Sequence, residues 1–286
     1  MPGDDGSKSV LITGCSTGIG RATALHLAER GWKVYATARR VETLRDLEGK
    51  VAAVLPLDVC DERTIGAAVR TIEEKDGAVG VLVNNAGYGQ EGAIEELPME
   101  KIRVQFETNV FGLVRLTQLV LPGMRRQRWG KIVNVSSMGG KLTLPGGGAY
   151  HASKHALESV SDALRFEARP FGIDVIVIEP GPIRTAFGDT AGVSLSSLSL
   201  ATESPYARLN AVVARMLEDG YRGRMAVFAG SPESVARTIE RAITAPRPKP
   251  RYVITVVARM LLGMKWLLPD RAFDTFLRLQ LKTLGY

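Results

Sequence analysis

Cysteine is scarce in this chain, and its two copies limit the disulfide and metal chemistry available to the protein. Cys15 and Cys60 lie far apart, and neither has the spacing of a metal-binding or redox motif. Two cysteines allow at most one disulfide, which excludes a small scaffold stapled by several bridges. The composition is therefore more typical of a reducing compartment. We expect a cytoplasmic protein without a bound metal.

Long uninterrupted apolar runs are also absent. Residues 253–268 are apolar, but Arg259 and Lys265 interrupt them, so this stretch is not predicted to span a membrane. Residues 1–8 are polar and contain no apolar signal core. We interpret them as a disordered N-terminal tail.

Positive charge is in excess, but it is concentrated at one end of the chain. The net charge is +7, and residues 246–286 hold eight basic residues and two acids, which leaves the remainder near neutrality. A near-neutral body argues against a nucleic-acid-binding protein. With 286 residues, 45% of them hydrophobic and 23% charged, the chain is typical of a globular protein of one large domain or two small ones.

Short apolar runs alternate with amphipathic segments along most of the chain. We predict strands at residues 9–12, 33–38, 51–57, 80–83, 131–136, 173–179 and 252–256. Helices are predicted after the first strand, ending at Gly31, and at residues 61–76, 99–126, 150–171 and 206–217. This alternation predicts an α/β fold with a three-layer, doubly wound parallel sheet of about seven strands.

Residues 186–231 interrupt this rhythm with many Ser, Thr, Gly and Ala. An irregular segment of this length inside a compact domain is commonly functional, so we interpret it as a lid over the substrate region. We predict a Rossmann-type catalytic domain at residues 9–245. Residues 246–286 are predicted to form a basic C-terminal extension with amphipathic helices.

Glycines fill the turn after the first strand. Gly14, Gly18 and Gly20 allow the backbone to approach a pyrophosphate, and the helix that follows offers free N–H groups and a positive dipole. A glycine-rich turn without a ligand is the alternative interpretation. We favour a dinucleotide, because the turn lies between a strand and a helix.

The end of the second predicted strand lacks the acid that would hold the ribose of NAD. Arg39 and Arg40 occupy this place, and a guanidinium can bind the 2′-phosphate of NADP with two hydrogen bonds. A solvated arginine pair is the alternative. Asp58 and Val59 follow the third strand and are predicted to meet the adenine.

Tyr150 and Lys154 lie four residues apart on a predicted helix and therefore share a face. An ammonium near a phenol favours the phenolate, so we expect Lys154 to lower the pKa of Tyr150. Tyr150 could then exchange a proton with a substrate oxygen that Ser137 also binds. The alternative interpretation is a Tyr–Lys pair on the protein surface without a catalytic role.

Together these motifs resemble the short-chain dehydrogenase/reductase family. The resemblance extends from about Ser9 to Phe187 and depends on the order and spacing of several motifs: Thr13-Gly14-x-x-x-Gly18-Ile19-Gly20, Asp58, Asn84-Asn85-Ala86-Gly87, Asn109, Ser137, Tyr150-x-x-x-Lys154 and Pro180-Gly181. It implies catalytic roles for Asn109, Ser137, Tyr150 and Lys154, with Asn109 supporting a water-mediated proton path to Lys154.

The resemblance also implies which residues contact a nicotinamide cofactor. They are Gly14, Ser16, Thr17, Gly18, Ile19, Gly20, Arg39, Arg40, Asp58, Val59, Asn85, Ala86, Gly87, Tyr150, Lys154, Pro180, Gly181, Ile183 and Thr185. Pro180, Gly181 and Thr185 would hold the carboxamide. We expect NADP(H) to be preferred, with NAD(H) as the rival.

The chain also resembles members that act on steroids, retinoids and other lipophilic alcohols or ketones. It also implies a homodimer or homotetramer formed through the helices at residues 99–126 and 150–171. The basic tail could pack on the body or a partner subunit, contact a membrane peripherally, or close over the active site. An NADP(H)-sensing or scaffolding relative without catalysis is the alternative function.

Overall fold

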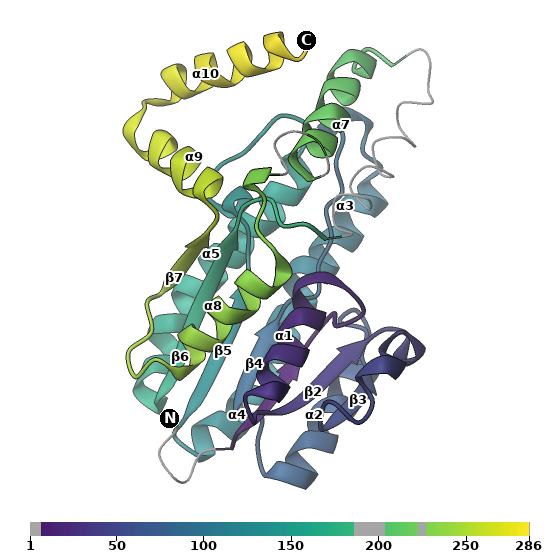
Figure 1. Cartoon of the computed structure of the whole chain (residues 1–286), viewed down its shortest axis with the longest axis vertical. Helices are drawn as coiled ribbons and strands as arrows, with labels where there is room; N and C mark the ends of the chain where they lie inside the picture. Colours follow the sequence, from purple (N-terminus) through teal and green to yellow (C-terminus); the bar gives the residue numbers. More distant parts are fainter. Residues whose placement is uncertain (1–6, 186–203, 222, 224–226, 286) are drawn as a thin grey trace.

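A seven-stranded parallel sheet with helices on both faces forms the centre of the molecule (Figure 1). The computed structural model describes residues 7–185, 204–221, 223 and 227–285. The strand order is β3-β2-β1-β4-β5-β6-β7, and all pairs are parallel. The strands are β1 (Ser9–Ile12), β2 (Lys33–Ala38), β3 (Ala53–Pro56), β4 (Val81–Asn84), β5 (Gly130–Val135), β6 (Ile173–Pro180) and β7 (Arg251–Ile254). The order reverses between β1 and β4, which creates a crevice at their carboxyl ends. The predicted fold class is confirmed.

Two groups of helices cover the sheet. On one face lie α1 (Gly18–Glu29) and α8 (Pro232–Thr244), which pack against each other. On the other face lie α2 (Glu62–Asp76), α4 (Gly112–Arg126) and α5 (Gly148–Ala168). Each group seals a separate apolar layer against the sheet, represented by Leu27 and Ile239 on one side and by Ile72 and Leu116 on the other.

The helix predicted at residues 99–126 is interrupted by a π-helical turn. It consists of α3 (Met99–Phe106), the turn η3 (Glu107–Phe111) and α4. A π-turn adds a residue to the helical turn and redirects its side chains, and such turns are frequent at functional sites. Asn109 lies within it.

The last strand ends two residues earlier than predicted. Thr255 has φ 82°, a left-handed backbone that a β-branched residue rarely adopts, so the strand cannot continue through it. The hydroxyl of Thr255 accepts a hydrogen bond from the N–H of Ala258 at 3.2 Å and caps the next helix. The chain continues as α9 (Val256–Leu267) and α10 (Asp270–Thr283).

The region around the predicted lid contains a helix that the sequence analysis missed. Helix α8 starts at a Ser231 cap followed by Pro232 and Glu233, which is a recognisable start signal. Helix α7 spans Ala207–Tyr221, four residues beyond its predicted end. Ile183 pairs with Gly230, so the flanks of the segment meet. Residues 186–203, 222 and 224–226 of the predicted lid, and residues 1–6 of the predicted tail, lie outside the described residues.

None of the helices in the described ranges has the length and apolar content needed to cross a bilayer. The stretch at residues 253–268, which was not predicted to span, is divided between β7 and α9.

Candidate active site

The glycine-rich turn is held in place by the loop after β4. Thr13 Oγ1 accepts hydrogen bonds from the backbone N–H groups of Asn85 (3.0 Å) and Ala86 (2.9 Å). Asn85 Nδ2 donates to the carbonyl oxygen of Thr13 at 2.8 Å and to that of Gly14 at 3.1 Å. Two loops that are distant in sequence are thereby fixed as one surface.

The turn has the backbone that only glycine accommodates easily. Gly14 has φ 72° and Gly18 has φ 60°, both in the left-handed region. A Cβ at Gly20 would overlap the carbonyl oxygen of Gly14 and the side-chain amide of Asn85. The absence of a side chain at Gly20 therefore allows the turn and the Asn85 side chain to pack directly on the first turn of α1.

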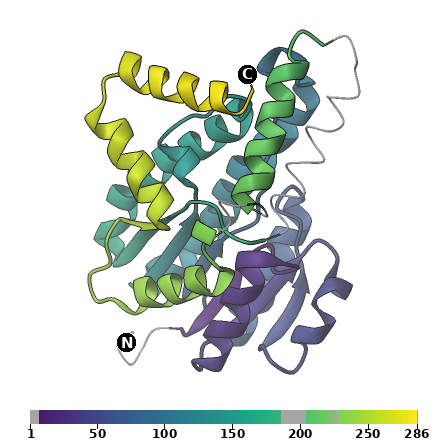
Figure 2. The ribbon, with the colours of Figure 1, turned by 45° about the horizontal axis from the view of Figure 1, so that its top comes forward.

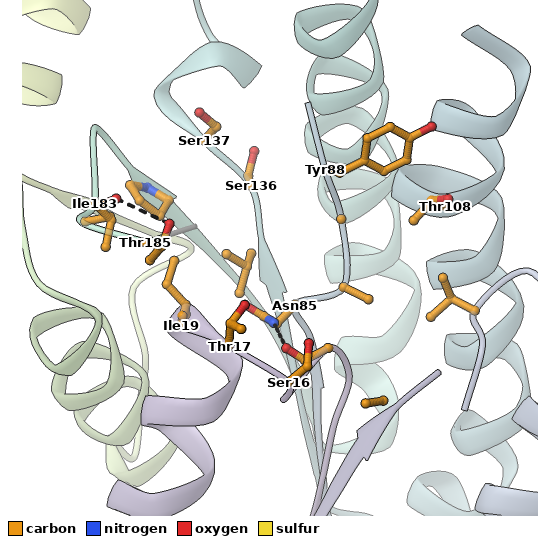
Figure 3. Close-up of a pocket in the computed structure, with 18 of the residues that line it drawn as sticks. Ser16, Thr17, Ile19, Asn85, Tyr88, Thr108, Ser136, Ser137, Ile183 and Thr185 are labelled. Carbon is orange, nitrogen blue, oxygen red and sulfur yellow. Dashed lines mark hydrogen bonds between the residues drawn. The ribbon is translucent and has the colours of Figure 1, made fainter. Parts of the chain in front are cut away.

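A cavity of about 730 Å³ lies at the carboxyl ends of the strands. It is lined by every residue predicted to contact the cofactor except Gly20 and Arg40. Figure 3 shows Tyr88 and Thr108 across this cavity from Ile183 and Thr185. Segments between Gly14 and Thr185 thus form one continuous surface, although their individual roles remain predictions.

One end of the cavity carries Arg39 and Asp58. Arg39 is exposed directly after β2, whereas the neighbouring Arg40 begins the short helix η1 (Val41–Leu47) and does not line the cavity. The predicted contact of Arg40 with the cofactor therefore stays a prediction that the cavity lining does not support. Among the described lining residues, Asp58 is the sole carboxylate, and its Oδ1 accepts a hydrogen bond from the Cys60 N–H at 2.9 Å.

The other end carries Ser137, Tyr150 and Lys154. Ser137 caps the turn η4 (Met138–Gly140), where its Oγ accepts a hydrogen bond from the Gly139 N–H at 3.1 Å. Lys154 Nζ donates to the carbonyl oxygen of Val135 at 2.9 Å and lies 6.0 Å from the centre of the Tyr150 ring. Both α5 residues are buried.

Burial is the main cause of the pKa shifts of Tyr150 and Lys154. It raises the pKa of Tyr150 well above that of a free phenol, and a hydrogen bond with Ser137 opposes it without prevailing. Burial also lowers the pKa of Lys154 to about 8, against the attraction of Glu158. The expectation that Lys154 lowers the pKa of Tyr150 is therefore wrong for the chain alone. The ammonium is bonded to Val135, and desolvation of the phenol is the larger effect.

Asn109 lies behind the cavity wall. Its Nδ2 donates to the carbonyl oxygen of Tyr88 and to Ser153 Oγ, both at 3.0 Å, and its Oδ1 accepts from the Tyr88 N–H at 3.1 Å. A Cβ at Gly87 would lie 3.0 Å from Asn109 Oδ1 and 3.6 Å from Lys154 Nζ. Gly87 thus leaves open the space between Asn109 and Lys154, where the predicted proton path would pass.

Several lining residues were missed by the sequence analysis. Tyr88 directly follows the Asn-Asn-Ala-Gly segment and could have been found by extending that motif by one residue. Cys60, Val104 and Thr108 lie near the Asp58 end, and Tyr221 enters from α7. No local signal marks Tyr221, since only the folded chain brings α7 to the crevice. Both cysteines are free thiols, Cys15 buried and Cys60 exposed.

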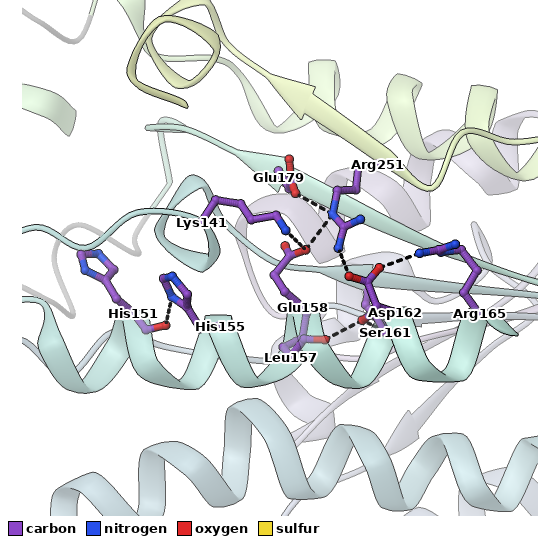
Figure 4. A network of polar contacts seen from close by, with 11 residues as sticks. Lys141, His151, His155, Leu157, Glu158, Ser161, Asp162, Arg165, Glu179 and Arg251 are labelled. Carbon is purple, nitrogen blue, oxygen red and sulfur yellow. Dashed lines mark hydrogen bonds and ion pairs between the residues drawn. The ribbon is translucent and has the colours of Figure 1, made fainter. Parts of the chain in front are cut away.

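A network of charged side chains joins helix α5 to strand β7 (Figure 4). Arg251 Nε of β7 lies 3.0 Å from Glu158 Oε2 and 3.2 Å from Glu179 Oε1, and its Nη2 lies 2.7 Å from Asp162 Oδ2. Lys141, at the end of η4, lies 3.8 Å from Glu158. The turn that carries Ser137 is therefore connected to α5 one helical turn beyond Lys154.

The cavity fits a nicotinamide dinucleotide by its shape and its donors. The turn without side chains at Gly14 and Gly18 leads into the N-terminus of α1, which suits a pyrophosphate. No group of three or more His, Cys, Asp or Glu side chains in the described ranges is arranged to hold a metal ion.

Comparison with known proteins gives the family. The model of the short chain dehydrogenase family matches residues 8–192. The uncharacterized oxidoreductase YbbO of Escherichia coli K12 is 38% identical over 273 residues, which cover 95% of this chain and 94% of YbbO. The NADPH-dependent 3-dehydrocapnine reductase of Ornithobacterium rhinotracheale is 34% identical, with 97% and 98% covered. Human 17-beta-hydroxysteroid dehydrogenase type 1 is 36% identical, with 90% and 80% covered.

Solved structures agree with this assignment. A short-chain dehydrogenase from Streptomyces avermitilis has a TM-score of 0.79 and 33% identity, and 98% of each chain is covered. A serine dehydrogenase bound to NADP+ has a TM-score of 0.74 and 26% identity, with 87% of this chain and 95% of the other covered. A family member from Burkholderia phymatum bound to NAD has a TM-score of 0.76 and 26% identity, with 92% and 94% covered. Structural neighbours thus bind either nicotinamide cofactor, and this chain belongs to the short-chain dehydrogenase/reductase family of oxidoreductases.

Proposed function

We propose that this protein is an NADP(H)-dependent oxidoreductase that interconverts a lipophilic alcohol and its ketone or aldehyde. The observation that carries the proposal is a single cavity with Arg39 at one end and Ser137, Tyr150 and Lys154 at the other. A guanidinium at the first end suits the 2′-phosphate of NADP. A hydroxyl and a phenol at the second end suit a substrate oxygen.

The side chains have separable roles in this reaction. The bound nicotinamide supplies or accepts the hydride. Ser137 and Tyr150 bind the substrate oxygen, and Tyr150 donates or removes its proton. Lys154 holds the nicotinamide ribose. Near neutral pH the phenol of Tyr150 carries its proton, which is the form that can protonate a substrate oxygen in the reductive direction, although its raised pKa makes it a weaker acid than a free phenol.

The proposed substrate class is supported by the site and by relatives. Leu142 is buried and Leu144 partly buried in the loop before Tyr150, and we propose that this loop presents an apolar surface to the substrate, although neither residue is among those that line the cavity. The human relative is named for a hydroxysteroid, a lipophilic alcohol. The relative from Ornithobacterium is named for NADPH and a dehydro substrate that it reduces.

Substitution of Tyr150 tests the proposed chemistry. We expect Tyr150→Phe to lower kcat by about 10²–10⁴-fold, the usual contribution of a positioned acid–base group, and to leave NADPH affinity within about threefold. Turnover would be followed by nicotinamide absorbance over a panel of lipophilic ketones and alcohols with both cofactors. NADPH affinity would be measured by fluorescence titration. Turnover by the variant at the wild-type rate would refute the assignment. A wild-type chain that binds NADPH but reduces no member of the panel would favour a sensing role.

We also propose a homodimer or homotetramer formed through the outer faces of α3 to α5. Large apolar side chains are exposed on and beside these helices: Phe111 in η3, Phe166 in α5 and Phe171 just after α5 are between 39% and 71% exposed. Sedimentation velocity should show an oligomer that Phe111→Ser and Phe166→Ser weaken together. A monomeric wild-type chain at micromolar concentration would contradict this proposal.

A further inference from the structure

Helices α9 and α10 lie at the same edge of the sheet as the cavity. β7 ends at Ile254 and leads directly into α9, and the carboxyl ends of parallel strands share one edge. Figures 1 and 2 both show the two helices forming a corner at that end of the molecule, with the end of α10 beside α7. A Cβ at Gly181, which lines the cavity, would lie 3.1 Å from Ala258 Cβ. The inner face of α9 therefore packs against the cavity wall.

The outer face of α9 carries large apolar side chains that face solvent, with the exposed Arg259 among them. Val256 is 61% exposed, Met260 62%, Trp266 87% and Leu267 73%. Their spacing of four, ten and eleven residues from Val256 places all four on one side of an α-helix. We call these four residues the α9 apolar face. Large apolar side chains gathered on one exposed stripe mark an interaction surface, whereas scattered ones do not.

Cations surround the α9 apolar face. The segment from Val256 to Thr283 contains five cations and two carboxylates. Lys265 pairs with Asp270 at 2.6 Å. In the described part of the chain, no ion pair involves the four other cations, which are Arg259, Arg271, Arg278 and Lys282. The surface therefore offers unpaired positive charge next to exposed apolar area.

We propose that α9 and α10 bind the surface of an anionic lipid bilayer, with the α9 apolar face inserted at the level of the headgroups. A helix with Trp, Leu and Met on one side and cations nearby is suited to that boundary. Tryptophan is enriched there because its ring is apolar while its N–H can still be solvated. Each cation near an anionic leaflet adds electrostatic attraction that salt weakens.

Charge favours an anionic bilayer over a second copy of the chain as the partner of the α9 apolar face. A twofold interface would place the same patch of both subunits together, and the unpaired cations of one copy would face those of the other. Like charges brought together oppose such an interface, whereas anionic headgroups neutralise them. The exposed Phe111 of η3 and Phe166 of α5 lie on other elements and leave the α9 apolar face available.

The bilayer surface would also be coupled to the substrate region through α7. Arg208 Nε donates to the carbonyl oxygen of Gly285 at 2.8 Å, and Tyr221 at the other end of α7 lines the cavity. This coupling rests on the proposed function, because it would bring a lipophilic substrate to the cavity from the bilayer. Binding of the lipid surface itself does not depend on turnover.

Vesicle binding by the full-length chain tests the proposal. The probes are vesicles of phosphatidylcholine alone and of phosphatidylcholine mixed with phosphatidylglycerol, with co-sedimentation and tryptophan emission as readouts. We expect binding to the anionic vesicles only, a blue shift from Trp266, and weaker binding at high salt, because ions screen surface charge. Substitution of Met260, Trp266 and Leu267 by Ser together should reduce the partition coefficient roughly tenfold or more, since it removes most of the exposed apolar area.

A matched control separates insertion from general apolar exposure. Phe166→Ser removes a side chain that is 71% exposed on α5, and we expect it to leave vesicle binding unchanged under conditions where sedimentation velocity shows the same assembly state as the wild type. Circular dichroism and NADPH titration would verify that each variant is folded. The proposal is overturned if the wild-type chain ignores anionic vesicles, or if the triple variant binds them as well as the wild type does. It is also overturned if the triple substitution only dissociates an oligomer. NADPH turnover by a wild-type chain that does not bind vesicles would refute bilayer binding by α9 and α10 and would leave the proposed enzymatic function standing.

Discussion

At the scale of single residues, burial changes the chemistry that sequence spacing suggests. Tyr150 and Lys154 have helical spacing, yet Lys154 Nζ is bonded to the Val135 carbonyl oxygen and the phenol is desolvated. Burial favours the neutral form of each group, so it raises the pKa of the Tyr150 phenol and lowers the pKa of the Lys154 ammonium. In the chain alone the phenol is therefore a weaker acid than a free phenol, which is itself protonated at neutral pH. The two neighbouring arginines show a similar contrast, because only Arg39 lines the cavity.

Arg39 should determine the choice between cofactors. We expect Arg39→Asp to reduce the preference for NADPH over NADH by about tenfold or more, because a charge-assisted hydrogen bond is replaced by repulsion from a phosphate. The measurement is kcat/KM with each cofactor at fixed substrate. Arg40→Asp is the matched control, with the same change of charge one residue away and outside the cavity, and should shift the ratio far less. Equal effects from both variants would indicate that the overall positive charge of this region, and not a contact between Arg39 and the phosphate, sets the cofactor preference.

At the scale of elements, the network around Arg251 links β6, β7, α5 and the Ser137 turn. Glu158 and Glu179 both face the same guanidinium, and both carboxylates are buried. Burial, reinforced by the neighbouring Glu158, raises the pKa of Glu179 from 4.5 to about 7 although Arg251 and Lys141 oppose the shift. The folded chain therefore holds a proton on Glu179 where the unfolded chain has already lost it.

This shift predicts how stability depends on pH. Glu179 contributes stability that is fully present below about pH 4.5 and is lost as the pH rises through about 7, because the folded state must then ionise a buried acid. In Glu179→Gln that contribution no longer changes with pH. Between pH 5 and pH 8, the variant should therefore gain about 1 kcal/mol or more of unfolding free energy relative to the wild type.

Urea unfolding at both pH values measures the difference. Glu167→Gln, at an exposed position of α5, is the control and should leave the difference near zero. If the unfolding free energies of Glu179→Gln and the wild type change equally between pH 5 and pH 8, Glu179 is already ionised in the folded chain at pH 5.

At the scale of the whole molecule, a rigid sheet supports elements that are held by few contacts. β1, β4 and β5 are buried on both faces, whereas α9 contributes only Ala258 to the buried set and α10 only Phe273 and Leu281. Helix α7 is tied near its start, where Asn210 Nδ2 donates to Glu96 at 2.8 Å and Arg208 bonds the end of the chain. Helices α7, α9 and α10 are therefore expected to open more easily than the sheet.

Removal of α10 should loosen α7 and leave the sheet unchanged. We expect deletion of residues 269–286 to speed amide exchange in α7 by about tenfold or more, because the contacts of Arg208 and Arg215 with the chain end are lost. Exchange in α1 should stay within about twofold. Hydrogen exchange with mass spectrometry measures both helices. Uniform acceleration would instead mean that α10 stabilises the whole fold.

The amount that could be predicted from the sequence differs between the two ends of the cavity. The glycine turn, the Asn-Asn-Ala-Gly loop and the Tyr150–Lys154 pair are local patterns, because backbone freedom and helical spacing require only neighbouring residues. Tyr221 and the bonds of Asn109 to Tyr88 and Ser153 depend on elements far apart in the chain. The interruption of the long helix at residues 107–111 has no clear local signal either.

The sequence by itself determined the alternation of strands and helices, the parallel sheet and the family, since each follows from periodicity and short motifs. Only the tertiary structure decided that Arg39 and not Arg40 reaches the cavity, that the pKa of Tyr150 is raised, and that the apolar stripe of α9 faces solvent. The physical reason is that burial and desolvation depend on which distant elements pack together, and no local pattern records that packing.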